Sequence, residues 1–208
     1  MKYNFNENGV IFGGTFDPIH KGHLNVICYL LKNKIAESVM LVPSGIPPFK
    51  KDSVRLQGEE RLNLCRLAIA DFEKEYGKEY SDRVFINCDE IYSPECSYTS
   101  CTIEKIKKDY NIQNKVNFVI GDDVVQTLTK WHRAEYLKNN VRFILFHRIG
   151  GKSEAIENLV KDGYEIRVIS NPCFEYSSSA VRERNIYDAL SPSVKEEYIK
   201  ILNKKNIT

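Results

Sequence analysis

The sequence predicts an α/β fold in which helices cover both faces of a mostly parallel, doubly wound sheet. Three observations lead to this prediction: short apolar runs rich in Val, Ile, Leu and Phe recur, helical patterns separate them, and 208 residues suit one domain. Such runs are typical of parallel strands that are buried on both faces. Right-handed crossovers between the strands would place ligands at the carboxyl ends of the strands.

The order of the elements follows from the apolar runs and from the helical periods between them. Strands are predicted at residues 9–13, 37–43, 84–89, 116–121, 141–147 and 165–170. Helices are predicted at residues 22–34, 58–76, 99–110, 152–162, 178–186 and 193–203. Residues 44–57 and 90–98 carry Pro and polar residues without a period, so we expect mobile loops there.

Nothing in the chain marks a domain boundary, because no repeat, Gly/Ser linker or low-complexity tract occurs. Residues 1–208 are therefore predicted to form a single domain of the Rossmann-like type. Its C-terminal helical part, about residues 175–208, is expected to pack on the rest of the domain.

The charge balance and the cysteines restrict the classes of binding partner and the cellular compartment that we expect. The chain has 30 Lys and Arg residues against 28 Asp and Glu, a formal charge of +2, so no nucleic-acid partner is predicted. No apolar run reaches the roughly 18 residues of a membrane span, so no membrane partner is predicted either. The 6 cysteines form no Cys-x-x-Cys pair and the first residues lack a secretion signal, which indicates a reduced, cytoplasmic protein. The spacing of Cys96 and Cys101 disfavours a zinc site, and no protein-held metal is predicted.

The most informative pattern covers residues 13–23, Gly-Gly-Thr-Phe-Asp-Pro-Ile-His-Lys-Gly-His, directly after the first apolar run. Its two leading glycines let backbone N–H groups approach an anion closely, and the helix N-terminus that follows favours negative charge. His20 and His23 are three positions apart at the helix start, so both imidazoles can face one phosphate, and Gly22 leaves room between them. The pattern therefore predicts a phosphate site.

This motif resembles the His-x-Gly-His signature of the nucleotidyltransferase superfamily. The longer form, Gly-Gly-Thr-Phe-Asp-Pro-x-His, is similar to that of the bacterial nicotinate-nucleotide adenylyltransferases. The resemblance implies an enzyme of NAD biosynthesis that transfers an adenylyl group from ATP to nicotinate mononucleotide and releases pyrophosphate. It also implies that Mg²⁺ arrives with ATP instead of lying in a protein cage.

Residues 176–182, Tyr-Ser-Ser-Ser-Ala-Val-Arg, follow the last predicted strand and begin a helix that offers hydroxyls, N–H groups and a guanidinium to an anion. A serine cap beside a solvated arginine would give the same pattern. The segment resembles the family's Ile-Ser-Ser-Thr-x-Ile-Arg, with substitutions at three positions. The resemblance implies that Ser178, Ser179 and Arg182 bind the β and γ phosphates of ATP, with Tyr176 near the adenine.

Two further cationic side chains are assigned to substrate binding, although their segments depart from the family pattern. Lys50 ends a segment similar to Pro-Pro-His-Lys, with Phe49 in place of the histidine, and is expected to reach the polyphosphate. Plain solvent exposure is the alternative for Lys50. Arg148 follows a predicted strand where the family has Arg-Pro-Gly, and Ile149 breaks that match. Arg148 is assigned to the mononucleotide, and a structural ion pair is the alternative.

Two segments resemble the family's site for the pyridine ring. Residues 97–103 are similar to Ser-Tyr-Thr-x-Asp-Thr-Leu, with Cys101 in place of the acid, which assigns Thr99 to the mononucleotide. Helix capping alone would also explain these hydroxyls. The second segment contains Gly-Asp-Asp, which ends at Asp123, and the only tryptophan, Trp131, and it is similar to the family's Gly-x-Asp followed by a Trp. Asp123 is therefore expected to orient sugar hydroxyls, and Trp131 is expected to stack on the pyridine ring. Core packing is the alternative for Trp131.

The implied reaction requires no general base. A phosphate oxygen of nicotinate mononucleotide attacks the α-phosphorus of ATP, and this monoester is already mostly ionised near neutral pH because its second pKa is about 6. The protein must hold two anions together and stabilise the charge on the α-phosphate and the leaving pyrophosphate. Gly13 and Gly14 are expected to donate to the phosphates. Thr15, His20 and His23 are the predicted catalytic residues, with both imidazoles stabilising the transition state.

Several alternative functions stay open. The acceptor of the adenylyl group could be nicotinamide mononucleotide, since carboxylate recognition can rest on backbone N–H groups, or another phosphorylated compound. Phosphopantetheine and cytidylyl acceptors belong to that second group. Phosphopantetheine is disfavoured because the family that uses it has a motif similar to Thr-x-Gly-His, whereas this chain has His20 at the first position of that motif. A non-catalytic nucleotide sensor is the alternative from another class, and an RNA-binding synthetase fragment lacks support from a basic face. A homo-oligomer is possible.

Overall fold

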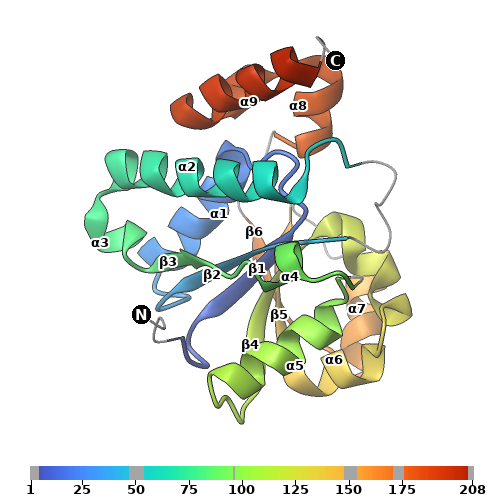
Figure 1. Ribbon diagram of the computed structural model, residues 1–208. Helices are drawn as coiled ribbons and strands as arrows, with labels where there is room; N and C mark the ends of the chain where they lie inside the picture. The colour runs from blue at the N-terminus through green and yellow to red at the C-terminus, as the bar shows by residue number, and fades with distance from the viewer. Residues whose placement is uncertain (1–4, 47–53, 96, 148–153, 171–175, 206–208) are drawn as a thin grey trace.

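The sheet contains six parallel strands in the order β3-β2-β1-β4-β5-β6 (Figure 1). The computed structural model describes residues 5–46, 54–95, 97–147, 154–170 and 176–205. The strands are β1 (Val10–Gly14), β2 (Val39–Pro43), β3 (Val84–Ile86), β4 (Val116–Gly121), β5 (Val141–His147) and β6 (Glu165–Ser170). This order reverses between β1 and β4, which is the switch point of a doubly wound sheet. The predicted fold class is confirmed.

The helices form a layer on each face of the sheet (Figure 1). Helices α1 and α2 cover one face, α8 and α9 lie beyond α2 on the same side, and α5, α6 and α7 cover the other face. Their bounds are α1 (Lys21–Lys32), α2 (Gly58–Tyr76), α3 (Lys78–Ser81), α4 (Asp89–Tyr92), α5 (Thr99–Asp109), η2 (Asp122–Lys130), α6 (Ala134–Asn140), α7 (Glu154–Lys161), α8 (Ser178–Arg184), η3 (Tyr187–Ala189) and α9 (Pro192–Lys205). No helix in the described part of the chain is long and apolar enough to cross a membrane.

Each face of the sheet has its own apolar core, because successive strand residues point to opposite faces. On β1, Val10 and Phe12 belong to the core beneath α1, α2 and α9, whereas Ile11 belongs to the core beneath α5, α6 and α7. Val10 and Ile11 have no exposed surface. Burial on both sides explains why this strand is a continuous apolar run in the sequence.

The C-terminal helix α9 is held on α2 by apolar packing and by one buried carboxylate. Tyr198 of α9 and Phe72 of α2 lie in the same core. Asp71 accepts hydrogen bonds from the backbone N–H of Ser193 (2.7 Å) and from its hydroxyl (2.6 Å), and thereby caps the first turn of α9. Burial would raise the pKa of Asp71, but these hydrogen bonds, together with those from Ser191 and Lys74, outweigh burial and hold that pKa below its usual value.

The structure corrects the predicted elements between the strands. The strand predicted at 84–89 ends at Ile86, because the Asn87 side chain accepts from the Asp89 N–H (2.9 Å) and turns the chain into α4. Residues 90–92, predicted as part of a loop, therefore belong to a helical turn. The helical segments α3, η2, α6 and η3 were not predicted. Helices α3, α6 and η3 are short, and η2 is a 3₁₀ helix, whose turn of three residues differs from the α-helical period.

Candidate active site

A cavity of about 590 Å³ lies at the carboxyl ends of β1 and β4, where the strand order reverses. Twelve of the predicted site residues line it: Gly13, Gly14, Thr15, His20, His23, Thr99, Asp123, Trp131, Tyr176, Ser178, Ser179 and Arg182. Gly22 is buried in the first turn of α1 and does not line the cavity. Lys50, Arg148, Phe49 and Cys96 lie outside the described residues. The fold thus gathers segments that are far apart in the chain.

The two glycines at the end of β1 are favoured by packing. A Cβ on Gly13 would lie 2.8 Å from the Phe118 ring, and a Cβ on Gly14 would lie 3.0 Å from the Phe16 ring. Phe16 itself has a φ of 48°, in the left-handed region that few side chains adopt. The sequence analysis attributed these glycines to the close approach of an anion to the backbone. The structure adds that aromatic rings already occupy the space beside them.

The two histidines lie face to face at the start of α1. Their ring centroids are 3.7 Å apart with an interplanar angle of 29°. The backbone N–H of His20 donates to Nδ1 of His23 at 3.1 Å, so a neutral His23 carries its proton on Nε2. The edge of the Phe16 ring packs against His23 at 5.0 Å. Backbone and aromatic contacts therefore fix both imidazoles at the cavity wall.

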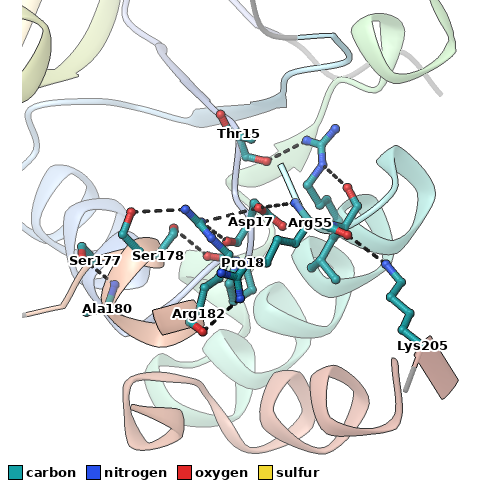
Figure 2. Close-up of polar contacts among 12 residues, drawn as sticks. Thr15, Asp17, Pro18, Arg55, Ser177, Ser178, Ala180, Arg182 and Lys205 are labelled. Carbon is teal, nitrogen blue, oxygen red and sulfur yellow. Dashed lines mark hydrogen bonds and ion pairs between the residues drawn. The ribbon is translucent and has the colours of Figure 1, made fainter. Parts of the chain in front are cut away.

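The segment that begins α8 is bonded directly to the β1 loop (Figure 2). The Ser178 hydroxyl donates to the carbonyl of Pro18 at 2.9 Å. Arg182 donates through Nη1 to the carbonyl of Asp17 at 2.5 Å and through Nη2 to the Ser179 hydroxyl at 3.2 Å. The helix cap is Ser177, which accepts from the Ala180 N–H at 3.1 Å. Capping therefore does not occupy the Ser178 and Ser179 hydroxyls.

Asp17 is a site residue that the sequence analysis left unassigned. Its carboxylate is 2 % exposed and accepts from the N–H groups of Arg55 (2.9 Å) and Leu56 (3.0 Å). Its Oδ2 also lies 3.5 Å from Nη1 of Arg182. One side chain thus joins the β1 loop to the entrance of α2 and to α8 (Figure 2). The Asp-Pro pair within the motif was the only signal for it.

Arg61 of α2 binds the loops at this edge of the sheet. Its guanidinium donates to the carbonyls of Thr15 (2.7 Å), Gly45 (3.1 Å) and Leu56 (3.3 Å). Burial lowers the pKa of Arg61, although the negative charges of Asp17 and other neighbours oppose the shift. A guanidinium stays charged in proteins, so Arg61 is a buried cation satisfied largely by carbonyl oxygens. No pattern in the sequence indicated this role.

Glu90 connects the β2 loop to α5 and also lines the cavity. Its Oε1 accepts from the Thr102 hydroxyl at 2.5 Å. Burial raises the pKa of Glu90, while hydrogen bonds from Thr102, Ser97 and the Gly45 N–H oppose the shift. Ser97 also accepts from the Gly45 N–H at 2.9 Å. The segment that leads into α5 is thereby held against the segment that follows β2.

The far end of the cavity is an aromatic wall formed by the start of α5 and the segment after η2. The rings of Tyr98 and His132 stack at 4.4 Å with an angle of 28°, and Nδ1 of His132 is 2.8 Å from the hydroxyl of the fully buried Ser100. Trp131 is half-buried and both contacts the core and lines the cavity. Thr99 begins α5, whose cap is Tyr98 without a side-chain hydrogen bond, so Thr99 is not the capping residue.

The comparisons with known proteins agree on the family. The cytidylyltransferase-like family model matches residues 11–184. The chain is 32% identical to a probable nicotinate-nucleotide adenylyltransferase of Dehalococcoides mccartyi, over 91% of this chain and 93% of that protein. The chain belongs to this cytidylyltransferase-like family. A second probable nicotinate-nucleotide adenylyltransferase, from Clostridium botulinum, is 34% identical over 85% of this chain and 86% of its own.

A solved structure shares this fold. The Plasmodium falciparum nicotinic acid mononucleotide adenylyltransferase complexed with NaAD superimposes with a TM-score of 0.74 at 20% identity, covering 93% of this chain and 95% of that chain. Among the residues that the structure describes, no group of three or more His, Cys, Asp or Glu side chains could hold a metal ion.

Proposed function

We propose that this protein transfers the adenylyl group of ATP to nicotinate mononucleotide, giving nicotinate adenine dinucleotide and pyrophosphate. The observation that carries the proposal is the division of one cavity into two ends of different chemistry. Imidazoles, hydroxyls and a guanidinium line one end, as a polyphosphate requires. Aromatic rings line the other end, as a pyridine ring requires. The names of the relatives support the same reaction.

The histidine pair stabilises the charge that develops on the α-phosphate. Because Nδ1 of His23 already accepts from the backbone, its Nε2–H is the group that can donate to a phosphate oxygen. His20 is 6 % exposed and lies parallel to it, so neither imidazole has to reorganise when the transition state forms. The acceptor phosphate is itself the nucleophile, and no side chain has to remove a proton.

The start of α8 holds the leaving pyrophosphate. Arg182 has five N–H donors and two of its nitrogens are oriented by Asp17 and Ser179, which leaves donors for phosphate oxygens. The Ser178 hydroxyl donates its only hydrogen to the Pro18 carbonyl, so it would have to exchange that bond to donate to a phosphate oxygen. Mg²⁺ enters as the MgATP complex and neutralises phosphate charge. Tyr176 lies beside this end of the cavity, where the adenine is expected.

The acceptor lies along the aromatic wall. Trp131 stacks on the pyridine ring, Asp123 accepts from the ribose hydroxyls, and Thr99 offers the first turn of α5 to the carboxylate end. Lys50 is assigned to the polyphosphate and Arg148 to the mononucleotide from the sequence alone.

Pyrophosphate release tests this function directly. The enzyme is incubated with ATP, Mg²⁺ and either nicotinate or nicotinamide mononucleotide, and kcat/KM is compared between the two acceptors. We expect release with both or with the acid alone, and a higher kcat/KM for the acid. A preference for the amide would keep the mechanism and replace the substrate. Absence of release with either acceptor would overturn the proposal.

A further inference from the structure

We propose that Glu90 is a positioning residue for the acceptor mononucleotide: its carboxylate holds the start of α5 against the segment that follows β2. The inference deepens the proposed function and rests on it. Both segments line the cavity, the first through residues 97–99 and Thr102, the second through Ser44. They come from different parts of the chain, so their relative position has to be fixed by side chains that join them.

The carboxylate of Glu90 accepts hydrogen bonds from both segments. On the α5 side, the Thr102 hydroxyl donates to Oε1 at 2.5 Å, and the Ser97 hydroxyl donates to the same carboxylate. On the β2 side, the donor is the backbone N–H of Gly45. Glu90 itself lies on α4, which belongs to neither segment. One side chain therefore joins two walls of the cavity from a third element.

Close backbone packing brings the two segments within reach of this carboxylate. A Cβ on Gly45 would lie 1.9 Å from the carbonyl oxygen of Glu90, so a side chain at that position would force α4 away from the segment after β2. Ser97 makes two bonds across the same contact. Its hydroxyl accepts from the Gly45 N–H at 2.9 Å, and its backbone N–H donates to the Ile46 carbonyl at 2.9 Å. The carboxylate thus lies at the junction of both segments.

The negative charge of Glu90 is balanced by groups of the protein, which limits its repulsion of an anionic acceptor. The guanidinium of Arg61 donates to the Gly45 carbonyl at 3.1 Å, and its charge attracts that of Glu90. The donors from Thr102, Ser97 and Gly45 also occupy most of the roughly four acceptor positions of a carboxylate. A carboxylate with so few free lone pairs is suited to hold segments of the protein together. It is not suited to bind the substrate or to remove a proton from it.

The bond to Thr102 acts on Thr99, the residue assigned to the mononucleotide. The two residues are three positions apart on α5, so they lie on the same face of the helix, and both line the cavity. Holding Thr102 from α4 therefore fixes the position and the rotation of the first turn of α5. A substrate that binds against this turn depends on Glu90. ATP, which is assigned to α8 and the β1 loop, does not.

Glu90→Gln tests this role, because it keeps the length of the side chain and replaces one acceptor oxygen with a donor. We expect the KM for the mononucleotide to rise roughly tenfold, as for the loss of a hydrogen bond to a charged group. The values of kcat and of the KM for ATP should change less than about twofold, whereas a general loss of structure would change all three constants. Pyrophosphate release, measured with each substrate varied in turn, gives these constants.

Substitutions of Thr102 test the same bond from its other partner. Thr102→Val keeps the shape of the side chain and removes the hydroxyl, so the KM for the mononucleotide should rise. Thr102→Ser keeps the hydroxyl and should recover most of the affinity. In the double variant with Glu90→Gln, the increase in KM should be smaller than the product of the single increases, because both changes affect one shared bond.

Glu95→Gln is the matched control. Glu95 is an exposed acidic residue on the connection between α4 and α5, and it does not line the cavity. The substitution removes the same kind of charge close to the site without removing a bond to either segment. We expect it to leave the KM for the mononucleotide unchanged.

The outcomes separate this inference from the proposed function. An unchanged KM for the mononucleotide in Glu90→Gln and Thr102→Val, an equal increase in the KM for ATP, or increases that multiply in the double variant would overturn the positioning role and leave the reaction intact. If circular dichroism shows that Glu90→Gln does not fold, Thr102→Val and Thr102→Ser decide by the same constants. Absence of pyrophosphate release from the natural enzyme with either acceptor would overturn the proposed function and this inference together.

Discussion

Nη1 of Arg61 donates a 2.7 Å hydrogen bond to the carbonyl oxygen of Thr15, from a side chain that is 1 % exposed. This bond connects α2 to the loop between β1 and the histidine pair. The same guanidinium holds the carbonyls of Gly45 and Leu56, so the β1 loop and both ends of the connection between β2 and α2 depend on one side chain. A planar group with donors in a fixed fork can serve three acceptors at once, whereas an ammonium cannot hold the same geometry.

Replacing Arg61 with lysine should therefore lower both stability and activity. At least one buried carbonyl would lose its partner, and we expect a loss of about 1–3 kcal/mol in the free energy of unfolding. Urea denaturation followed by circular dichroism measures this change, together with kcat. Arg66→Lys on the exposed face of the same helix is the control and should change neither quantity. Equal stabilities of the two variants would contradict the role assigned to Arg61.

His23→Ala should reduce kcat by roughly 10²- to 10³-fold, which is typical for the loss of one transition-state donor. The KM for ATP should change much less, because the interaction strengthens only as charge develops. Steady-state pyrophosphate release gives both constants. Lys32→Gln, at the exposed far end of α1, controls for effects on the helix. A decrease in kcat of less than about threefold would refute a catalytic role.

Trp131→Ala should raise the KM for the mononucleotide about fivefold, since stacking contributes on the order of 1 kcal/mol beyond the buried area. The KM for ATP should stay unchanged, because the phosphate end of the cavity is formed by other segments. Trp131→Phe keeps an aromatic face and should recover part of the loss. If all three enzymes had the same KM for the mononucleotide, the stacking role would be wrong.

Asp71 should make the folded state sensitive to acid. Its pKa is lower in the folded protein than in the unfolded chain, because burial, the largest single effect, is outweighed by the hydrogen bonds from Ser193, Ser191 and Lys74 together. The stabilisation is therefore fully present above the unfolded pKa of about 4 and is lost as the pH falls through the folded pKa. Urea midpoints measured from pH 7 to pH 3 should fall more steeply in the natural protein than in Asp71→Asn. Parallel curves for the two proteins would contradict this account.

Local patterns in the sequence predicted the parts of the site that lie on one segment. The strand, glycine loop and histidine pair of residues 10–23 form as expected, because their spacing is set by one strand end and one helix turn. Trp131 and Arg182 were assigned from the family resemblance of their segments, and both line the cavity.

The parts that could not be predicted join residues that are distant in the chain. Asp17 and Leu56 are 39 positions apart, and Ser100 and His132 are 32 positions apart. No period or motif connects such pairs, since only the folded sheet brings their segments together. Glu90 was missed for the same reason, as its partner Thr102 belongs to the next helix.

The two cores of the sheet give this enzyme a modular design. Phe16 and Val181, which support the histidine loop and α8, belong to one core, whereas Phe118 and Leu128, which support β4 and η2, belong to the other. Phe118 also packs against Gly13, so changes to the second core that spare this contact can reshape the acceptor pocket while the machinery for nucleotide activation stays in place. A scaffold of this kind can acquire new acceptors during evolution and retain a single chemistry.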